Sequence, residues 1–141
     1  MSYTDDLKPK PLNLKELNAL VSTMPFNHLL GLRVSRLYAD GLTIEMEITP
    51  ELKNILGTLH GGATASLIDA AIGVAIIRQL GGRPATTVEL KLNYLRPAAQ
   101  GKVRARSKII KIGKTLVVGT AEIHDQHGYL IAMGSATYLP L

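Results

Sequence analysis

The spacing of apolar residues changes several times along this 141-residue chain, and each change marks an expected element. Residues 1–12 hold two prolines among polar side chains and are expected to form a flexible lead-in. From Leu14 to Val21 apolar residues recur at three- and four-residue intervals, which predicts a short helix ending near Met24. Asn13 followed three residues later by Glu16 predicts a capping box at its start.

Two further helical segments are expected. The segment from Pro25 to Gly31 predicts a brief helical turn with Phe26, Leu29 and Leu30 packed inward. A run that starts after a His-Gly-Gly sequence carries apolar residues on every face, which predicts a buried helix from 63 to about 80. Two glycines and a proline follow it and end the helix.

Elsewhere the apolar residues recur at every second position, which is typical of half-buried strands. Six segments have this character: 33–38, 42–48, 86–95, 102–112, 115–124 and 129–138. An antiparallel sheet of about six strands has one apolar face, and one long apolar helix laid across that face would cover it. The pattern therefore predicts an α+β fold, with residues 1–141 forming a single domain.

Composition limits the classes of function. Apolar residues make up 46% of the chain and charged residues 19%, as in an ordinary globular protein. The absence of cysteine excludes disulfides, thiolate nucleophiles and cysteine-based metal sites. A net charge of +5 and a pI of about 9.6 favour an anionic partner, namely nucleic acid, a membrane surface or a phosphorylated small molecule. Charge alone does not choose among these.

No membrane span or signal peptide is expected. The longest apolar stretch, from Ala63 to Ile77, is shorter than the roughly 20 residues that cross a bilayer, and Asp69 interrupts it. The first ten residues carry charges and lack the apolar core of a signal peptide. The sequence therefore predicts a cytoplasmic protein.

Asp69 is the principal candidate for chemistry because it lies among leucine, isoleucine and alanine in the predicted buried helix. Burying a carboxylate is costly unless the group is paired, and such acids serve as bases or nucleophiles. A lone acid in a helix is nevertheless more often a structural group that a nearby donor satisfies. Its interpretation therefore depends on the surrounding residues.

Gly61 and Gly62 stand where this helix begins. Unpaired backbone N–H groups and the helix dipole favour a developing negative charge at a helix start, and an N–H there can polarise a carbonyl group. Equally, the two glycines can make a tight turn into the helix. Eight residues separate Gly61 from Asp69, which is about 12 Å along one helix and too far for both to act on one carbonyl.

Two copies of the chain would remove this difficulty. If the helices of two subunits lay antiparallel across a twofold axis, Asp69 of one subunit would come near Gly61 of the other. The sequence therefore predicts an obligate homodimer with two sites at its interface. Whether such dimers pair into tetramers stays open.

The residues that match a known family are spread over most of the chain: Asn54, Gly57, His60-Gly61-Gly62, Asp69 and the strand from Thr87 to Pro97. Together they resemble the PaaI-type, 4HBT-like branch of the hotdog-fold acyl-CoA thioesterases. The spacing from His-Gly-Gly to Asp69 is the most specific part. Residues 24–27 are similar to a segment of bacterial medium- and long-chain acyl-CoA thioesterases.

The resemblance implies a hotdog fold, in which an antiparallel sheet of about six strands wraps around one long central helix. It also implies hydrolysis of an acyl-CoA to a carboxylate and CoA, with medium or long acyl chains favoured. No cofactor is expected, since CoA is part of the substrate.

The same resemblance implies roles for single residues. The Gly61 N–H would polarise the thioester carbonyl, and Asp69 of the partner subunit would activate water or attack directly. Asn54 matches a side chain that orients the thioester or the water, and Thr87 matches a serine or threonine that holds the water. His60 matches a histidine with a binding or orienting role. Taken alone, Asn54 would be an ordinary turn residue and Thr87 an ordinary strand threonine.

Candidate contacts to coenzyme A come from cations at predicted strand ends. Arg96, Lys111 and Lys114 are expected near its phosphates, because such loops lie at the mouth of the acyl site in the family it resembles. Gly62 is also assigned to substrate binding. The basic residues that alternate over 102–108 share one face of a strand, which is commonly only a solvated surface.

Other functions fit these residues less well. A hotdog dehydratase or hydratase would need a second acid or histidine along residues 63–80, where none occurs. A non-catalytic acyl-CoA-binding protein that controls a DNA-binding module would need more residues before Pro25. Nucleic-acid binding is disfavoured by one Phe and no Trp. No GxSxG sequence occurs, and the four histidines lack metal-ligand spacing, so no metal is expected.

Overall fold

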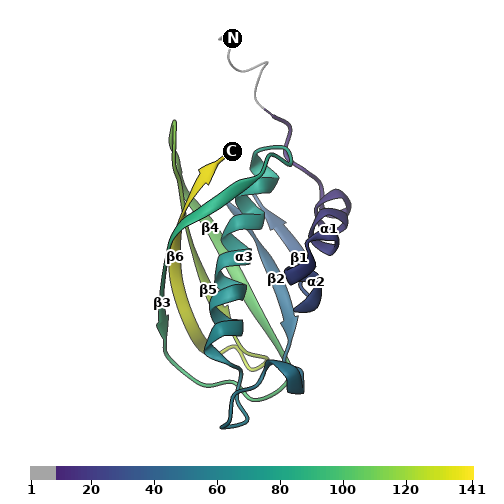
Figure 1. Cartoon of the computed structure of the whole chain (residues 1–141), viewed down its shortest axis with the longest axis vertical. Coiled ribbons are helices and arrows are strands. Elements are labelled where there is room, and N and C mark those ends of the chain that lie inside the picture. Colours follow the sequence, from purple (N-terminus) through teal and green to yellow (C-terminus); the bar gives the residue numbers. More distant parts are fainter. Residues whose placement is uncertain (1–8) are drawn as a thin grey trace.

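The computed structural model describes residues 9–141, and residues 1–8 of the predicted lead-in lie outside the described part. Figure 1 shows a curved sheet with one long helix, α3 (Gly61–Gln79), lying across it. Two short helices, α1 (Leu14–Thr23) and α2 (Pro25–Leu29), lie beside the β1 and β2 side of the sheet. The predicted α+β hotdog fold is confirmed.

The sheet has six antiparallel strands in the order β1-β2-β4-β5-β6-β3. Their bounds are β1 (Arg33–Tyr38), β2 (Gly41–Glu47), β3 (Ala85–Tyr94), β4 (Lys102–Ile112), β5 (Val117–His124) and β6 (Leu130–Pro140). A short 3-10 helix, η2 (Pro50–Leu52), follows β2. Each predicted strand is present within one or two residues of its expected bounds. Because β1 and β3 stand first and last in the strand order, they form the two edges of the sheet.

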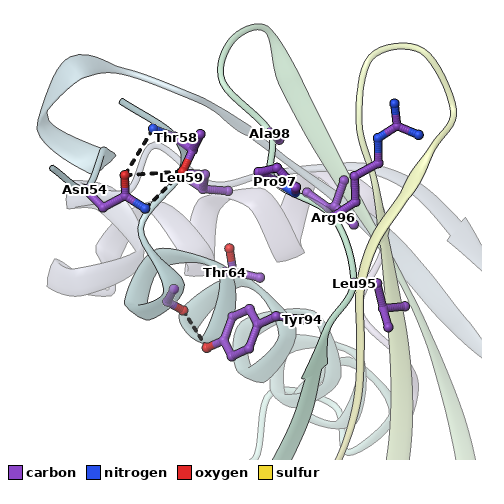
Figure 2. A pocket seen from close by; sticks show the side chains of 11 residues that line it. Asn54, Thr58, Leu59, Thr64, Tyr94, Leu95, Arg96, Pro97 and Ala98 are labelled. Carbon is purple, nitrogen blue, oxygen red and sulfur yellow. Dashed lines mark hydrogen bonds between the residues drawn. The ribbon is translucent and has the colours of Figure 1, made fainter. Parts of the chain in front are cut away.

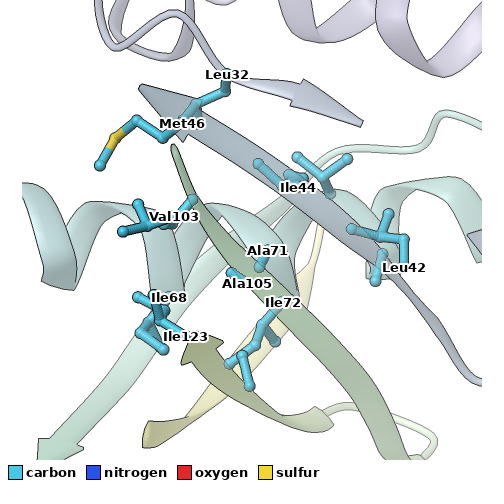
Figure 3. Close-up of a cluster of buried hydrophobic side chains, with 14 of the residues drawn as sticks. Leu32, Leu42, Ile44, Met46, Ile68, Ala71, Ile72, Val103, Ala105 and Ile123 are labelled. Carbon is cyan, nitrogen blue, oxygen red and sulfur yellow. The ribbon is translucent and has the colours of Figure 1, made fainter. Parts of the chain in front are cut away.

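The core lies between α3 and the sheet (Figure 3). Ile68 and Ile72 of α3 are fully buried, and so are Ile44 of β2, Val103 of β4 and Ile123 of β5. Strand residues at every second position face α3, as the two-residue period requires. Burial on this scale holds α3 in one position against the sheet.

α1 begins at the predicted capping box and covers one edge of the sheet. Asn13 Oδ1 accepts the Glu16 N–H at 2.9 Å, and Glu16 Oε1 accepts the Asn13 N–H at 3.2 Å. Further along α1, the Asn18 side chain donates to the carbonyl of Val34 and accepts from its N–H, both at 2.9 Å. These bonds satisfy backbone groups of the edge strand β1.

The expected inward packing of α2 is only partly correct. Leu30 is buried, but Phe26 is 56% exposed and Leu29 is 75% exposed. A helix of five residues is too short to bury more than one side, and these two side chains line a 520 Å³ cavity between α2 and the start of α3. The prediction that Phe26 and Leu29 pack inward is therefore wrong for the single chain.

The outer face of β4 is basic, as predicted, but two acids offset part of its charge. Arg104 Nε lies 3.0 Å from Glu45 Oε1, and Arg106 lies 2.8 Å from Asp40. The hydrogen bond from Arg104 lowers the pKa of Glu45. Val103 on the opposite face is fully buried. The strand thus divides its charged and apolar residues between solvent and core.

One helix in the described part of the chain, α3, is long and apolar enough to cross a membrane by length and composition. Of the apolar stretch of α3, 56% is buried inside the protein. The same composition is required of a helix that fills the core of a sheet protein. We therefore interpret α3 as the core helix.

α3 packs on β5 at a glycine. A Cβ atom at Gly119 would lie 2.7 Å from Cγ2 of Ile72 and 3.1 Å from the carbonyl oxygen of Lys108. These contacts are shorter than packed atoms tolerate, so the glycine sets how closely the helix approaches the sheet.

We expect Gly119→Ala to lower the free energy of unfolding by about 1–3 kcal/mol, because the new methyl group overpacks the helix–sheet contact. Lys108→Ala, an exposed change on the neighbouring strand, should stay within about 0.5 kcal/mol of the wild type. Urea unfolding followed by circular dichroism measures both. Equal stability of Gly119→Ala and wild type would show that α3 can move away from the sheet at no cost.

Candidate active site

Asp69 is held by two hydroxyl groups. Thr87 Oγ1 donates to Asp69 Oδ1 at 2.9 Å. The Tyr138 hydroxyl donates to the same oxygen and also lies 2.7 Å from the main-chain oxygen of Asp69. Thr87 and Tyr138 are cross-strand partners on β3 and β6, so one point of the sheet presents both donors to α3. The carboxylate is half-buried, and neutral donors rather than cations hold it.

Tyr138 was not predicted as a site residue. Its side chain is buried at 5% exposure, and burial together with its hydrogen bond to Asp69 raises the pKa of Tyr138 above its ordinary value. The phenol therefore keeps its proton and acts as a donor. A signal was present in the sequence, since a tyrosine at an inward position of an apolar strand needs a partner for its hydroxyl.

A cavity of about 230 Å³ opens beside this carboxylate, and we call it the Asp69 cavity. Thr87 and Tyr138 line it together with apolar residues of α3. Met24 and Phe26, from the segment that resembles medium- and long-chain enzymes, border it as well. The α2 segment thus lies next to the candidate catalytic acid.

The start of α3 leaves one backbone donor available. His60 is the N-cap, and its Nδ1 accepts the Gly62 N–H at 2.7 Å. The His60 carbonyl accepts the N–H groups of Ala63 and Thr64 at 3.0 and 3.1 Å. Within residues 9–141 the Gly61 N–H has no acceptor, so it can donate to a ligand. His60 thus caps the helix, and its predicted role toward the substrate stays a prediction.

A second cavity, of about 390 Å³, lies at this helix start, and we call it the Gly61 cavity (Figure 2). Asn54 lines it from the loop before α3, and Tyr94 and Arg96 line it from the end of β3 and the residues that follow. The Tyr94 hydroxyl donates to the Gly61 carbonyl oxygen at 2.8 Å. Tyr94 is a second residue that sequence reasoning did not single out, because only the folded β3 brings it to the helix start.

Asn54 organises the loop before α3. Its Oδ1 accepts the N–H groups of Leu56 and Thr58 at 2.9 and 3.1 Å, and its Nδ2 donates to Thr58 Oγ1 at 2.9 Å. The turn role that Asn54 would have on its own is therefore present. Nδ2 carries a second hydrogen that can be donated to a ligand in the Gly61 cavity.

The three candidate cations do not lie together in one chain. Arg96 borders the Gly61 cavity, and its guanidinium stacks 3.6 Å from the centre of the Tyr129 ring. Lys111 lies instead beside Gln79, the last residue of α3, and Lys114 follows in the turn between β4 and β5. A single chain therefore offers Arg96 at one end of α3 and the two lysines at the other.

The candidate catalytic residues are likewise divided. Thr87 contacts Asp69, whereas Asn54 lies with Gly61. Because α3 is continuous, the eight residues from Gly61 to Asp69 span about 12 Å, and each group has its own cavity. One chain therefore holds the candidate residues in two separate groups, which we call half-sites.

A hotdog fold with a hydroxyl-held carboxylate and a free helix-start amide is an arrangement suited to hydrolysis at a carbonyl. The pattern of the Thioesterase superfamily matches residues 56–132. Acyl-coenzyme A thioesterase 13 of Homo sapiens is 32% identical, over 86% of this chain and 89% of its own. The Escherichia coli medium/long-chain acyl-CoA thioesterase YigI is 27% identical, over 82% of this chain and 85% of its own. The chain belongs to the thioesterase superfamily, and the predicted enzyme class, thioester hydrolase, is confirmed.

Solved structures agree with this assignment. A thioesterase from Haemophilus influenzae superimposes with a TM-score of 0.86 at 27% identity, covering 96% of this chain and 94% of that one. Zebra fish thioesterase superfamily member 2 superimposes with a TM-score of 0.82 at 29% identity, covering 91% and 99%. The Escherichia coli PaaI protein, at 21% identity and a TM-score of 0.81 over 92% and 96%, shares the fold.

We expect His60→Ala to lower the free energy of unfolding by about 1 kcal/mol, because the Gly62 N–H loses its side-chain acceptor. His60→Asn should retain most of the stability, since asparagine is a good N-cap residue. Urea unfolding of both variants measures the effect. If the two variants were equally destabilised, the Nδ1 contact would not be the stabilising one.

Proposed function

We propose that this protein is an acyl-CoA thioesterase that works as a homodimer. The Gly61 N–H of one subunit polarises the thioester carbonyl, and Asp69 of the partner subunit activates water or attacks the carbonyl. The observation that carries the proposal is the division of one chain into two half-sites, with the acid and the amide about 12 Å apart on one rigid helix.

The sheet offers one open edge for a second subunit. β3 is an edge strand of 10 residues, most of them exposed, and its apolar Val88 is 53% exposed. Asn18 covers backbone groups of the opposite edge strand, β1. A long exposed edge is a template for pairing with another chain, and a second copy of β3 is a self-complementary partner for it.

The side of α3 that faces away from the sheet carries small residues, and these also favour a homodimer. Gly62, Ser66 and Ala70 are spaced four residues apart and are at least partly exposed. Small side chains allow a second helix to approach closely. An antiparallel pair centred near Ala65, midway between Gly61 and Asp69, would align the amide of one chain with the acid of the other.

In such a dimer the chemistry follows from the contacts of each half-site. The Gly61 N–H and the positive end of α3 stabilise the negative charge that develops on the carbonyl oxygen. Asp69 either takes a proton from a water molecule that attacks the carbonyl carbon, or attacks that carbon itself to form a mixed anhydride that water then hydrolyses. In both routes the C–S bond breaks and CoA leaves as its thiolate. Asn54 can donate its remaining amide hydrogen to the thioester or the water.

The phosphate groups of the CoA ester would contact the three candidate cations. Arg96 lies at the mouth of the Gly61 cavity, held in place by Tyr129. In an antiparallel dimer the partner's Lys111 and Lys114, which lie near the C-terminal end of its α3, would lie on the same side of the dimer as Arg96. A net charge of +5 would also speed the capture of a CoA ester.

We further propose that medium or long acyl chains are preferred. The Asp69 cavity is lined mainly by apolar side chains, among them Met24, Phe26 and Val74. Phe26 and Leu29 remain exposed in the single chain, where they can contact an apolar ligand or the second subunit. The relative named as a medium/long-chain enzyme agrees with this preference.

We expect Asp69→Asn to lower kcat for decanoyl-CoA by about 10²–10⁴-fold while the dimer and CoA binding persist. The amide Oδ1 can still accept both hydroxyl donors, so the variant loses the base but keeps the shape. Release of free thiol measures turnover, and size-exclusion chromatography measures the dimer. Near-normal turnover would remove Asp69 from the mechanism, and a wild type that binds the ester without releasing thiol would be a binding protein.

A second prediction tests the division of the site between subunits. Gly61→Pro removes the N–H but suits the first position of a helix, and the extended backbone of His60 is compatible with a following proline. We expect its kcat to fall by about 10²–10³-fold. Gly61→Ala, whose Cβ would make ordinary contacts of 3.4–3.5 Å with Tyr94, keeps the donor and should lose less activity.

Mixing the Asp69→Asn and Gly61→Pro proteins tests directly whether one site uses residues of two subunits. Co-refolded Asp69→Asn and Gly61→Pro chains form mixed dimers in which one of the two sites has both groups intact. Random pairing should restore about a quarter of the wild-type activity per chain. If each chain completed its own site, the mixture would stay inactive, and the shared-site proposal would fail.

A further inference from the structure

The carboxylate of Asp69 is bonded on one side only. Both hydroxyl donors, from Thr87 and Tyr138, reach Oδ1. In the described part of the chain no hydrogen bond reaches Oδ2, and the group borders the open Asp69 cavity. The two oxygens therefore have different environments, one anchored and one available.

The phenol of Tyr138 is placed by several independent features. Its ring is buried on β6, its hydroxyl contacts the side chain and the main-chain oxygen of Asp69 together, and its cross-strand partner is Thr87. A β-bulge follows Thr87 on β3, and bulges redirect side chains. A contact to both the backbone and the side chain of one residue limits the rotation of that carboxylate.

A glycine in the middle of α3 makes room for this phenol. Gly73 lies one turn after Asp69, where a Cβ atom would be 2.5 Å from the Tyr138 hydroxyl oxygen and 2.8 Å from the ring carbon that carries it. Glycine inside a helix is destabilising relative to alanine. Its presence at the point where the tyrosine enters is explained by the space that the phenol needs.

We propose that Tyr138 is a positioning residue for Asp69: it fixes Oδ1, together with Thr87, and leaves Oδ2 as the oxygen that acts on water or on the thioester. This inference rests on the proposed function of Asp69 and adds the group that sets its orientation. Gly73 contributes to this positioning because its lack of a side chain leaves room for the Tyr138 hydroxyl.

The test uses Tyr138→Phe, which removes one oxygen atom and keeps the buried ring. We expect kcat for decanoyl-CoA to fall by about 10-fold, because the carboxylate loses one of the two donors that fix Oδ1 and can rotate more freely. KM should change by less than about twofold, since the hydroxyl faces Asp69 rather than the CoA end. Tyr38→Phe on β1, which lines neither cavity, is the matched control and should keep the wild-type kcat and KM.

Gly73→Ala provides a second route to the same result without altering the tyrosine. The added methyl group should displace the hydroxyl, so kcat should fall by a similar factor while KM stays within about twofold of the wild type. Size-exclusion chromatography first establishes that each variant is assembled like the wild type. If Tyr138→Phe keeps the wild-type kcat, or if its KM rises as much as its kcat falls, the proposal is overturned.

The failure of this proposal and that of the proposed function are distinguishable. If Asp69→Asn is inactive and Tyr138→Phe keeps the wild-type kcat, Asp69 remains catalytic and the tyrosine has only a packing role. If Asp69→Asn turns over substrate normally, Asp69 is not catalytic, and Tyr138 then has no catalytic carboxylate to position.

Discussion

The burial of α3 in the curve of the sheet is the constraint on which the rest of this structure depends. The helix is apolar on nearly every side, and side chains such as Ile68 and Ile72 fill the space against the strands. Gly119 lets the helix come closer than any larger residue would permit. A helix held so firmly cannot bend to bring Gly61 and Asp69 together, so the distance between them is a fixed property of the chain.

That rigidity explains why the functional groups are divided into two half-sites. The start of α3 offers an amide without an acceptor, prepared by the His60 cap, and its middle offers a carboxylate held by hydroxyl groups. In the proposed dimeric enzyme, each half supplies a group that the other half lacks. The open β3 edge and the small residues on the outward side of α3 are the features through which a second copy can complete each half.

The neutral environment of Asp69 has a chemical consequence. A carboxylate paired with arginine or lysine would be a weak base, because the cation stabilises its charge strongly. Two hydroxyl donors hold the group in place and still leave one oxygen available for reaction. The structure thereby combines fixed orientation with retained reactivity, and Tyr138 and Gly73 supply much of that orientation.

The sequence by itself determined the order and type of the α-helices and strands, but not the 3-10 helix η2. It also determined the capping box at Asn13, the family, and most residues of the candidate site. These follow from local periodicity and from motifs with fixed spacing. Only the tertiary structure revealed Tyr138 beside Asp69, Tyr94 beside Gly61, and the exposure of Phe26 that the sequence had suggested was buried. Those contacts join residues far apart along the chain, and their geometry depends on how the strands align and on how closely the helix packs. Local patterns of hydrophobicity carry no information about either.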